Sequence, residues 1–327
     1  MNKVPAMTGC SSGPEQRQDL RISRSIVLLP AFCAALWLPG LWASEAVNLY
    51  DQLYTKGTGS VFLNYQYIDV SKFQNGVNEV PIGEVRTQSL YLQAEYAVAE
   101  RWRLALGIPY IWKRASGATS HDPSTLVPPH PEVSFIDDGK YRPKFQDFYF
   151  GVDYLWINKP VQVEPFVHVL IPSHDYQFFA NSAVGQNLWR VELGLELTHF
   201  LPFSDWYYRL GGGYTIVQQT LGVNVNHFRA NAEVGYFLTP SFSLNVFGFG
   251  RKGNGNSAQA FPPPTRTTEA WFQHDRTTRH SSANVGIGAD WFFHEDYQLS
   301  ANAFTTVWGD SVHVIDFAGD IGITRYF

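Results

Sequence analysis

The stretch that decides the fold is WRVELGLELTHF, residues 189–200. Its apolar side chains alternate with charged, polar or small ones: Trp189, Val191, Leu193, Leu195 and Leu197 against Arg190, Glu192, Gly194, Glu196 and Thr198. Because a β-strand places successive side chains on opposite faces, the stretch predicts a strand with one apolar and one charged face. In a soluble sheet the apolar face would cover a core, whereas in a membrane it would contact lipid.

The same alternation recurs along the chain in segments of roughly ten residues, separated by residues typical of turns. Twelve such segments follow residue 46: about 58–69, 85–98, 102–112, 145–157, 161–171, 188–199, 206–217, 226–238, 242–251, 282–292, 297–308 and 316–327. An even number of strands of this length is typical of outer-membrane barrels. The sequence therefore predicts an all-β fold, a transmembrane antiparallel up-and-down β-barrel of about 12 strands.

The connections between these segments alternate between short and long. We expect tight turns at 99–101, 158–160, 239–241 and 293–296, and long links at 70–84, 113–144, 172–187 and 252–281. Outer-membrane barrels have short periplasmic turns and long extracellular loops. The proline runs VPPHPE (127–132) and FPPPTR (261–266) fall in two of the long links, and we expect them to be extended.

The N-terminal region has the pattern of an export signal. Arg17, Arg21 and Arg24 precede an apolar run at residues 25–43, and small residues follow it. We therefore expect residues 1–46 to be a signal peptide, cleaved after Ala43 or Ala46, and residues 47–327 to be the barrel. Both cysteines precede residue 46, which leaves no thiol chemistry for the mature chain.

Composition narrows the class of protein further. Charged residues make up 16% of the chain and aromatic residues another 16%, whereas soluble domains have about 25% charged residues. The net charge of -5 and the scattered Lys and Arg argue against nucleic-acid binding. We expect the outer membrane of a Gram-negative bacterium as the location and its lipid as a partner.

If the apolar face contacts lipid, the opposite face lines the lumen. The lumen-lining candidates are Glu95, Arg103, Asp147, Asp153, Glu164, His168, Arg190, Glu192, Glu196, Arg209, Arg229, Glu233, Asp290 and Asp320. Glu95 can pair with Arg103, and Glu196 with Arg209, across short turns. These charges either border a path for solutes or lock together as a plug. Acidic groups outnumber arginines among them and aromatic rings share their face, which favours small neutral or weakly hydrophobic cargo over anions.

Three of the ten histidines directly precede an aspartate, as His121-Asp122, His174-Asp175 and His274-Asp275. All three pairs fall in the long links. They can tie loops together by hydrogen bonds, bind a divalent metal if they converge, or transfer protons in catalysis. We predict no catalytic residue, metal or cofactor, and keep His174, Asp175, His274 and Asp275 as weak metal-ligand candidates. No hydrolase or zinc-protease motif is present in the sequence.

Three stretches resemble a known family: YAVAERWRLALGIPYIWKR (96–114), FIDDGKYRPKFQDFYFGVDY (135–154) and LIPSHDYQFFANSAVGQNLWRVELGLEL (170–197). They are similar to the MetA-pathway phenol-degradation family of bacterial outer-membrane proteins, which are often called transporters. The turn at 97–100 departs from the family, with Ala-Val-Ala-Glu where the family has Gly-Leu-Thr-Asp. The resemblance implies an outer-membrane barrel with a role in uptake of aromatic or hydrophobic compounds.

The chain ends in Phe327 after an alternating strand, which resembles the C-terminal signal recognised by the barrel-insertion machinery. Three functions are consistent with the whole sequence. The first is an outer-membrane channel or transporter for small, hydrophobic or aromatic solutes. The second is an outer-membrane enzyme or metal-binding protein with a His/Asp site in the extracellular loops. The third is a structural barrel with a charge-plugged lumen.

Overall fold

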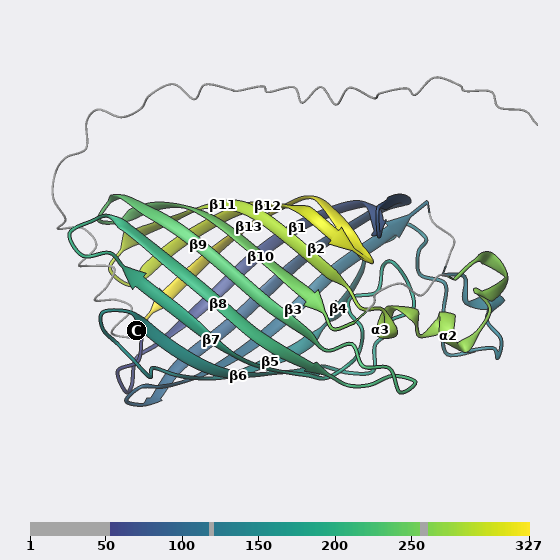
Figure 1. Cartoon of the computed structure of the whole chain (residues 1–327), viewed down its shortest axis with the longest axis horizontal. Helices are drawn as coiled ribbons and strands as arrows, with labels where there is room; N and C mark the ends of the chain where they lie inside the picture. The colour runs from purple at the N-terminus through teal and green to yellow at the C-terminus, as the bar shows by residue number, and fades with distance from the viewer. Residues whose placement is uncertain (1–52, 118–120, 256–260) are drawn as a thin grey trace, which may run out of the picture. The chain divides into compact units, whose positions relative to one another are not determined.

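The computed structural model describes residues 53–117, 121–255 and 261–327, so the predicted signal peptide lies outside the described residues. Thirteen strands form one antiparallel sheet, shown in Figure 1. They are β1 (Gly59–Asn75), β2 (Asn78–Ala99), β3 (Trp102–Ser116), β4 (Arg142–Phe145), β5 (Asp147–Tyr154), β6 (Gln162–Pro172), β7 (Arg190–Phe200), β8 (Trp206–Val217), β9 (His227–Thr239), β10 (Phe242–Gly253), β11 (Ser281–His294), β12 (Tyr297–Asp310) and β13 (Val312–Tyr326).

The sheet closes on itself. Apart from β4 and β5, which both pair with β3, each strand pairs with its neighbours in the chain, and β1 also pairs with β13. The short β4 pairs with residues 110–113 of β3, and β5 pairs with residues 102–107 of the same strand. Because β4 and β5 occupy one position in the ring, the barrel has twelve strand positions, and the prediction of a 12-stranded antiparallel barrel is confirmed.

The exposed apolar side chains lie on one parity of the strands, as the alternation predicts. On β7, Leu193 is 46% exposed, whereas its neighbour Glu192 is 4% exposed. Apolar side chains are also exposed on β10 and β11, where Val246 is 62% and Ile287 is 64% exposed. An apolar surface of this kind around a closed barrel is the surface that contacts lipid.

In the described part of the chain, no helix combines the length and the apolar composition that crossing a bilayer requires.

One predicted long link is wrong. The strands β1 and β2 continue well past residue 70, with Lys72 opposite Pro81 and Asn75 opposite Asn78, so only Gly76 and Val77 join them. Gly76 has a φ of 60°, which suits a tight hairpin turn. The alternation stops early because both faces of this hairpin are solvated beyond the membrane, and the pairing shifts register between Val70 and Lys72.

The remaining long links are loops that pack on one another. The described residues 121–141, 173–189 and 261–280 contain the short helices η1 (Pro123–Thr125), η2 (Pro263–Thr265), α2 (Glu269–Phe272) and α3 (His274–Thr277). Figure 1 shows α2 and α3 beyond the strands, at the end opposite the C-terminus. A small apolar core joins the three loops: Leu126, Phe179, Trp271 and Phe272. The expectation that FPPPTR is extended is wrong for Pro263–Thr265, where the fixed φ of proline starts a helical turn.

Candidate functional site

The polar side chains of the barrel meet across intervening strands, which is possible only on the concave side of a closed sheet. Arg103 on β3 is the centre of one such group. Its guanidinium lies 3.3 Å from Glu95, 3.3 Å from Asp153 and 3.7 Å from Glu164, whose strand β6 is not a neighbour of β3. His168 contacts the second oxygen of Asp153 at 3.0 Å.

The chain segment before β1 completes this group. The Tyr54 hydroxyl donates to Glu164 at 2.6 Å, and its ring lies 4.7 Å from the Arg103 guanidinium. Tyr54 is 4% exposed. The group around Arg103 is therefore built from five separate segments and holds its charges in mutual contact at the turn end of the barrel.

A second group crosses β8, where Gly211, Gly212 and Gly213 interrupt the side-chain pattern. Arg229 on β9 donates to Glu192 on β7 at 2.6 Å, and Asn231 donates to Glu196 at 3.3 Å. A Cβ at Gly211 would overlap the Glu196 carboxylate and the Asn231 amide. The glycines thus leave the space through which β7 and β9 contact each other.

The remaining polar-face candidates also have partners. Arg190 donates to Asp147 at 2.6 Å, and Arg209 lies 3.6 Å from Glu233. Asp290 accepts from Gln298 at 2.7 Å, and Asp320 accepts from Asn302 at 2.9 Å and from Asn64 at 3.1 Å. Every residue of the predicted lumen-lining set has a polar contact with another side chain.

Of the two predicted cross-turn ion pairs, the structure contains one. The Glu95–Arg103 pair is present, although the two residues are diagonal, with Glu95 opposite Ala105. Glu196 is opposite Gly211 instead of Arg209, and it accepts from Asn231. The register of β7 and β8, which parity alone does not fix, decides this difference.

A cavity of about 990 Å³ lies at the loop end of the barrel. Its walls come from the ends of β1, β2 and β13 and from the loop residues 121–141, 173–189 and 261–280. Apolar and aromatic groups line much of it: Phe73, Val80, Pro81, Ile82, Phe261, Pro262, Pro263 and Trp271. Polar and charged residues line the remainder: Asn75, His121, Asp122, Thr125, Asn181, Arg266, Thr267, His274, Asp275, Thr278, His280, Ser311 and His313.

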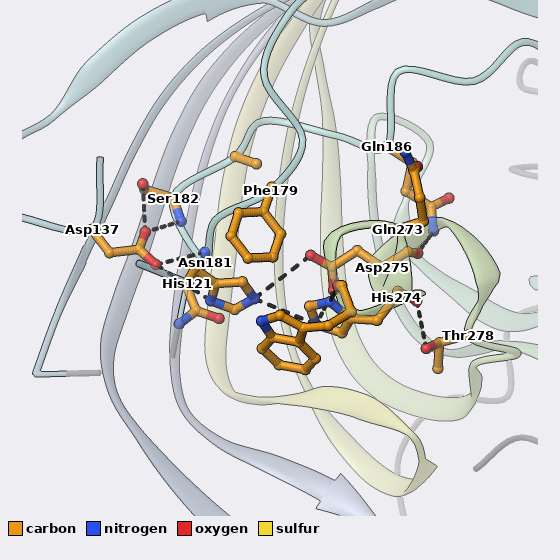
Figure 2. A network of polar contacts seen from close by, with 12 residues as sticks. His121, Asp137, Phe179, Asn181, Ser182, Gln186, Gln273, His274, Asp275 and Thr278 are labelled. Atoms are coloured by element: carbon orange, nitrogen blue, oxygen red, sulfur yellow. Dashed lines mark hydrogen bonds and ion pairs between the residues drawn. The ribbon is translucent and has the colours of Figure 1, made fainter. Parts of the chain in front are cut away.

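The loops bring together three residues from two of the predicted His-Asp pairs: His121, His274 and Asp275. Figure 2 shows His121, His274 and Asp275 pointing toward one another. Their facing atoms lie within 4.8 Å of one another. His174 and Asp175 lie elsewhere, where His174 contacts Ser173 at 2.9 Å and Asp175 accepts from Asn187 at 2.5 Å. Asp122 caps η1 and accepts from the Ser124 backbone amide, so it is a structural residue.

Electrostatics around the cluster favour a neutral imidazole beside charged carboxylates. Burial lowers the pKa of His274, and the nearby Asp275 offsets this only in part. Burial would raise the pKa of Asp275, but His274 and His121 outweigh it and keep that pKa below its usual value. Burial would also raise the pKa of Asp137, but His121 and hydrogen bonds from Ser182 and Asn181 keep that pKa below its usual value.

Sequence reasoning missed several residues of this region. Asp137 is 4% exposed and accepts from the backbone amides of Asn181 and Ser182, at 2.9 and 2.8 Å. His274 stacks on Trp271 with centroids 3.8 Å apart. Asp137 lies in the family-like stretch 135–154, but nothing in that stretch or around Trp271 indicates a contact with the histidines, and only the folding of distant loops brings them together.

Comparisons with known proteins agree with the barrel. Residues 95–312 match the family described as "Putative MetA-pathway of phenol degradation". Among curated proteins, no sequence relative was found.

Solved structures share the fold at low identity. The outer membrane channel COG4313 from Pseudomonas putida F1 has a TM-score of 0.61 and 16% identity, over 83% of this chain and 96% of that chain. The CymD monoaromatic hydrocarbon channel has a TM-score of 0.44 and 9% identity, over 88% of this chain and 93% of that chain. At these identities the likeness concerns the fold alone.

The family match covers most of the barrel, and the exposed apolar surface of the strands is the kind that lipid covers. The chain belongs to the MetA-pathway phenol-degradation family and has the fold of an outer-membrane β-barrel.

Proposed function

We propose that the protein is an outer-membrane channel for small, neutral, hydrophobic or aromatic compounds. The observation that carries this proposal is the cavity of about 990 Å³ at the loop end. Cavities of about 300 to 1,000 Å³ lined mainly by apolar groups are typical of sites for small organic molecules. The cavity lies where a solute from outside would first meet the barrel.

The walls of the cavity suit an aromatic solute. Phe73, Phe261 and Trp271 present rings, and Val80, Pro81 and Ile82 present aliphatic surface. Aromatic pairs are worth about 0.5–1.5 kcal/mol beyond burial of their area, which favours planar rings over aliphatic compounds of the same size. The family description, which names phenol degradation, supports the same class of solute.

We infer that the polar face of the barrel lines the path beyond the cavity. Acidic groups outnumber arginines there, which disfavours anions. The charges are largely paired with one another, so a neutral solute does not have to separate them. A smaller cavity of about 70 Å³ beside Glu192, Glu196 and Arg229 indicates that the side chains do not fill the interior at that level.

Two alternatives make different predictions. A structural barrel plugged by its charge network would pass no solute, and the dense contacts around Arg103 are the observation in its favour. The enzyme hypothesis has less support, because His174 lies apart from the other two histidines and contacts Ser173 instead. We therefore infer a channel and not an enzyme.

We also infer a partner contact for the side chain of Phe327. It is 57% exposed and its backbone pairs with Gly59 at the turn end of the barrel. We infer that this accessible ring is a contact for the barrel-insertion machinery.

The test of the proposed function is uptake of radiolabelled naphthalene by porin-deficient Gram-negative cells. Cells that produce the protein are expected to take up naphthalene faster than cells with an empty vector. Val80→Trp, which narrows the cavity, is expected to slow uptake, whereas Val77→Trp, at the exposed turn of the same hairpin, is expected to leave it unchanged. Equal uptake with and without the protein would contradict the proposal.

A further inference from the structure

Three potential metal ligands converge at the edge of the loop-end cavity (Figure 2). The Nε2 atoms of His121 and His274 are 3.4 Å apart. Asp275 places Oδ1 3.2 Å from His274 Nε2 and Oδ2 3.9 Å from His121 Nε2. A tetrahedral ion bonded at about 2.0–2.1 Å holds its ligand atoms about 3.3–3.4 Å apart. The two Nε2 atoms match this separation, and the Asp275 carboxylate has to turn to bring one oxygen to the same distance from both imidazoles.

The hydrogen bonds on the far side of each ring determine which nitrogens face the cluster. His274 Nδ1 is 2.6 Å from the Trp271 carbonyl oxygen, which can only accept, so Nδ1 carries the proton. His121 Nδ1 lies 3.6 Å from Asp137 Oδ2, which favours a proton there too. Both Nε2 atoms then present lone pairs toward each other. Metal-bound histidines typically have such an outer partner, which fixes the tautomer.

This arrangement brings two lone pairs and a carboxylate into contact. His121 is 6% exposed, so water does not screen the repulsion well. A cation between the three atoms removes that repulsion.

The rings are held in place before any ion binds. His274 stacks on Trp271 with an interplanar angle of 8°, and His121 meets Phe179 edge to face at 5.0 Å. Asp137 is fixed by Ser182 Oγ at 2.7 Å as well as by the backbone amides. The site therefore needs little rearrangement to accept an ion.

We propose that His121, His274 and Asp275 bind a divalent transition-metal ion of the Zn²⁺ class, with one coordination position open to the cavity. Two imidazoles and a carboxylate are a ligand set that such ions accept, and three protein ligands leave a position for water or a solute. The ligands come from the loop residues 121–141 and 261–280, so the ion clamps these two loops together beside the cavity. This site is independent of whether solutes cross the barrel.

The test is a calorimetric titration of the purified full-length protein in detergent with Zn²⁺, after chelator treatment. Wild type is expected to bind one ion per chain. His274→Ala and Asp275→Asn remove ligands and are expected to weaken binding by more than about 100-fold, and Asp137→Asn by about 10–100-fold. The control variants His174→Ala and Asp175→Asn alter a different His-Asp dipeptide, in another loop, and are expected to bind Zn²⁺ as wild type does.

Heat-modifiable migration on a denaturing gel verifies that each variant retains the barrel. Asp275→Asn keeps the size and shape of the side chain, so it remains informative if His274→Ala does not fold. A visible absorption spectrum typical of tetrahedral Co²⁺ in wild type, lost in Asp275→Asn, supports the ligand set. The proposal is overturned if folded wild type does not saturate with Zn²⁺, or if the His174→Ala and His274→Ala proteins bind it equally well.

Discussion

Replacing Arg103 by methionine tests the charge network most sharply. Its side chain is 16% exposed and lies within 3.7 Å of three carboxylates, from Glu95, Asp153 and Glu164. Methionine keeps much of the volume but leaves those carboxylates without their guanidinium. Removing one partner of a buried ion pair costs about 3–5 kcal/mol. With a urea dependence of about 2 kcal/mol/M, the unfolding midpoint should fall by about 1.5–2.5 M.

The assay is reversible urea unfolding of the barrel in lipid vesicles, followed by tryptophan fluorescence. Lys72→Met is the matched control, because Lys72 pairs with Glu79 at 2.8 Å but the two side chains are 46% and 51% exposed. Its midpoint should stay near that of wild type, since exposed pairs contribute little. Adding Glu164→Gln to Arg103→Met should recover part of the lost midpoint, because it removes one of the carboxylates left without a partner. Equal midpoints for Arg103→Met and Lys72→Met would refute the reasoning.

Three further predictions concern other parts of the barrel. Gly211→Ala should cost about 1–3 kcal/mol in unfolding free energy, because its Cβ overlaps Glu196, whereas Gly212→Ala, whose Cβ meets only the Arg229 carbonyl at 3.6 Å, should be nearly neutral. Leu193→Arg, on the lipid face, should cost up to about 2–4 kcal/mol in the same assay, and an unchanged stability would contradict lipid contact. Arg276→Ala removes hydrogen bonds of 2.8 Å to the Gln186 and Asn187 carbonyls. It should therefore speed limited proteolysis within residues 254–280. An unchanged rate of cleavage would show that these hydrogen bonds do not hold the loop in place.

The strands could be predicted because lipid imposes a period of two on every segment that crosses it. Leu193 and Glu192 must face opposite media, and that requirement is visible in the sequence. Past the membrane the constraint ends, which is why the hairpin of β1 and β2 was predicted to stop near residue 70 although it continues to Asn75 and Asn78.

Contacts within the polar face could be predicted only in part. Parity assigns Glu196 and Arg209 to one face, but the register places Gly211 opposite Glu196. The loop cluster depends still more on tertiary structure. His121 and His274 are far apart in the chain, and nothing in their identical dipeptides distinguishes them from His174. The apolar core of Leu126, Phe179, Trp271 and Phe272 brings the right pair together.

The proposed channel requires a path through the barrel, and planar-bilayer conductance of the purified protein tests for this path. We expect stepwise conductance with a preference for cations, because acidic groups outnumber arginines on the polar face. Arg103→Met should increase that preference by removing a positive charge from the face. A protein that inserts into the bilayer but stays silent at every voltage and salt concentration would contradict the claim and favour the plugged barrel.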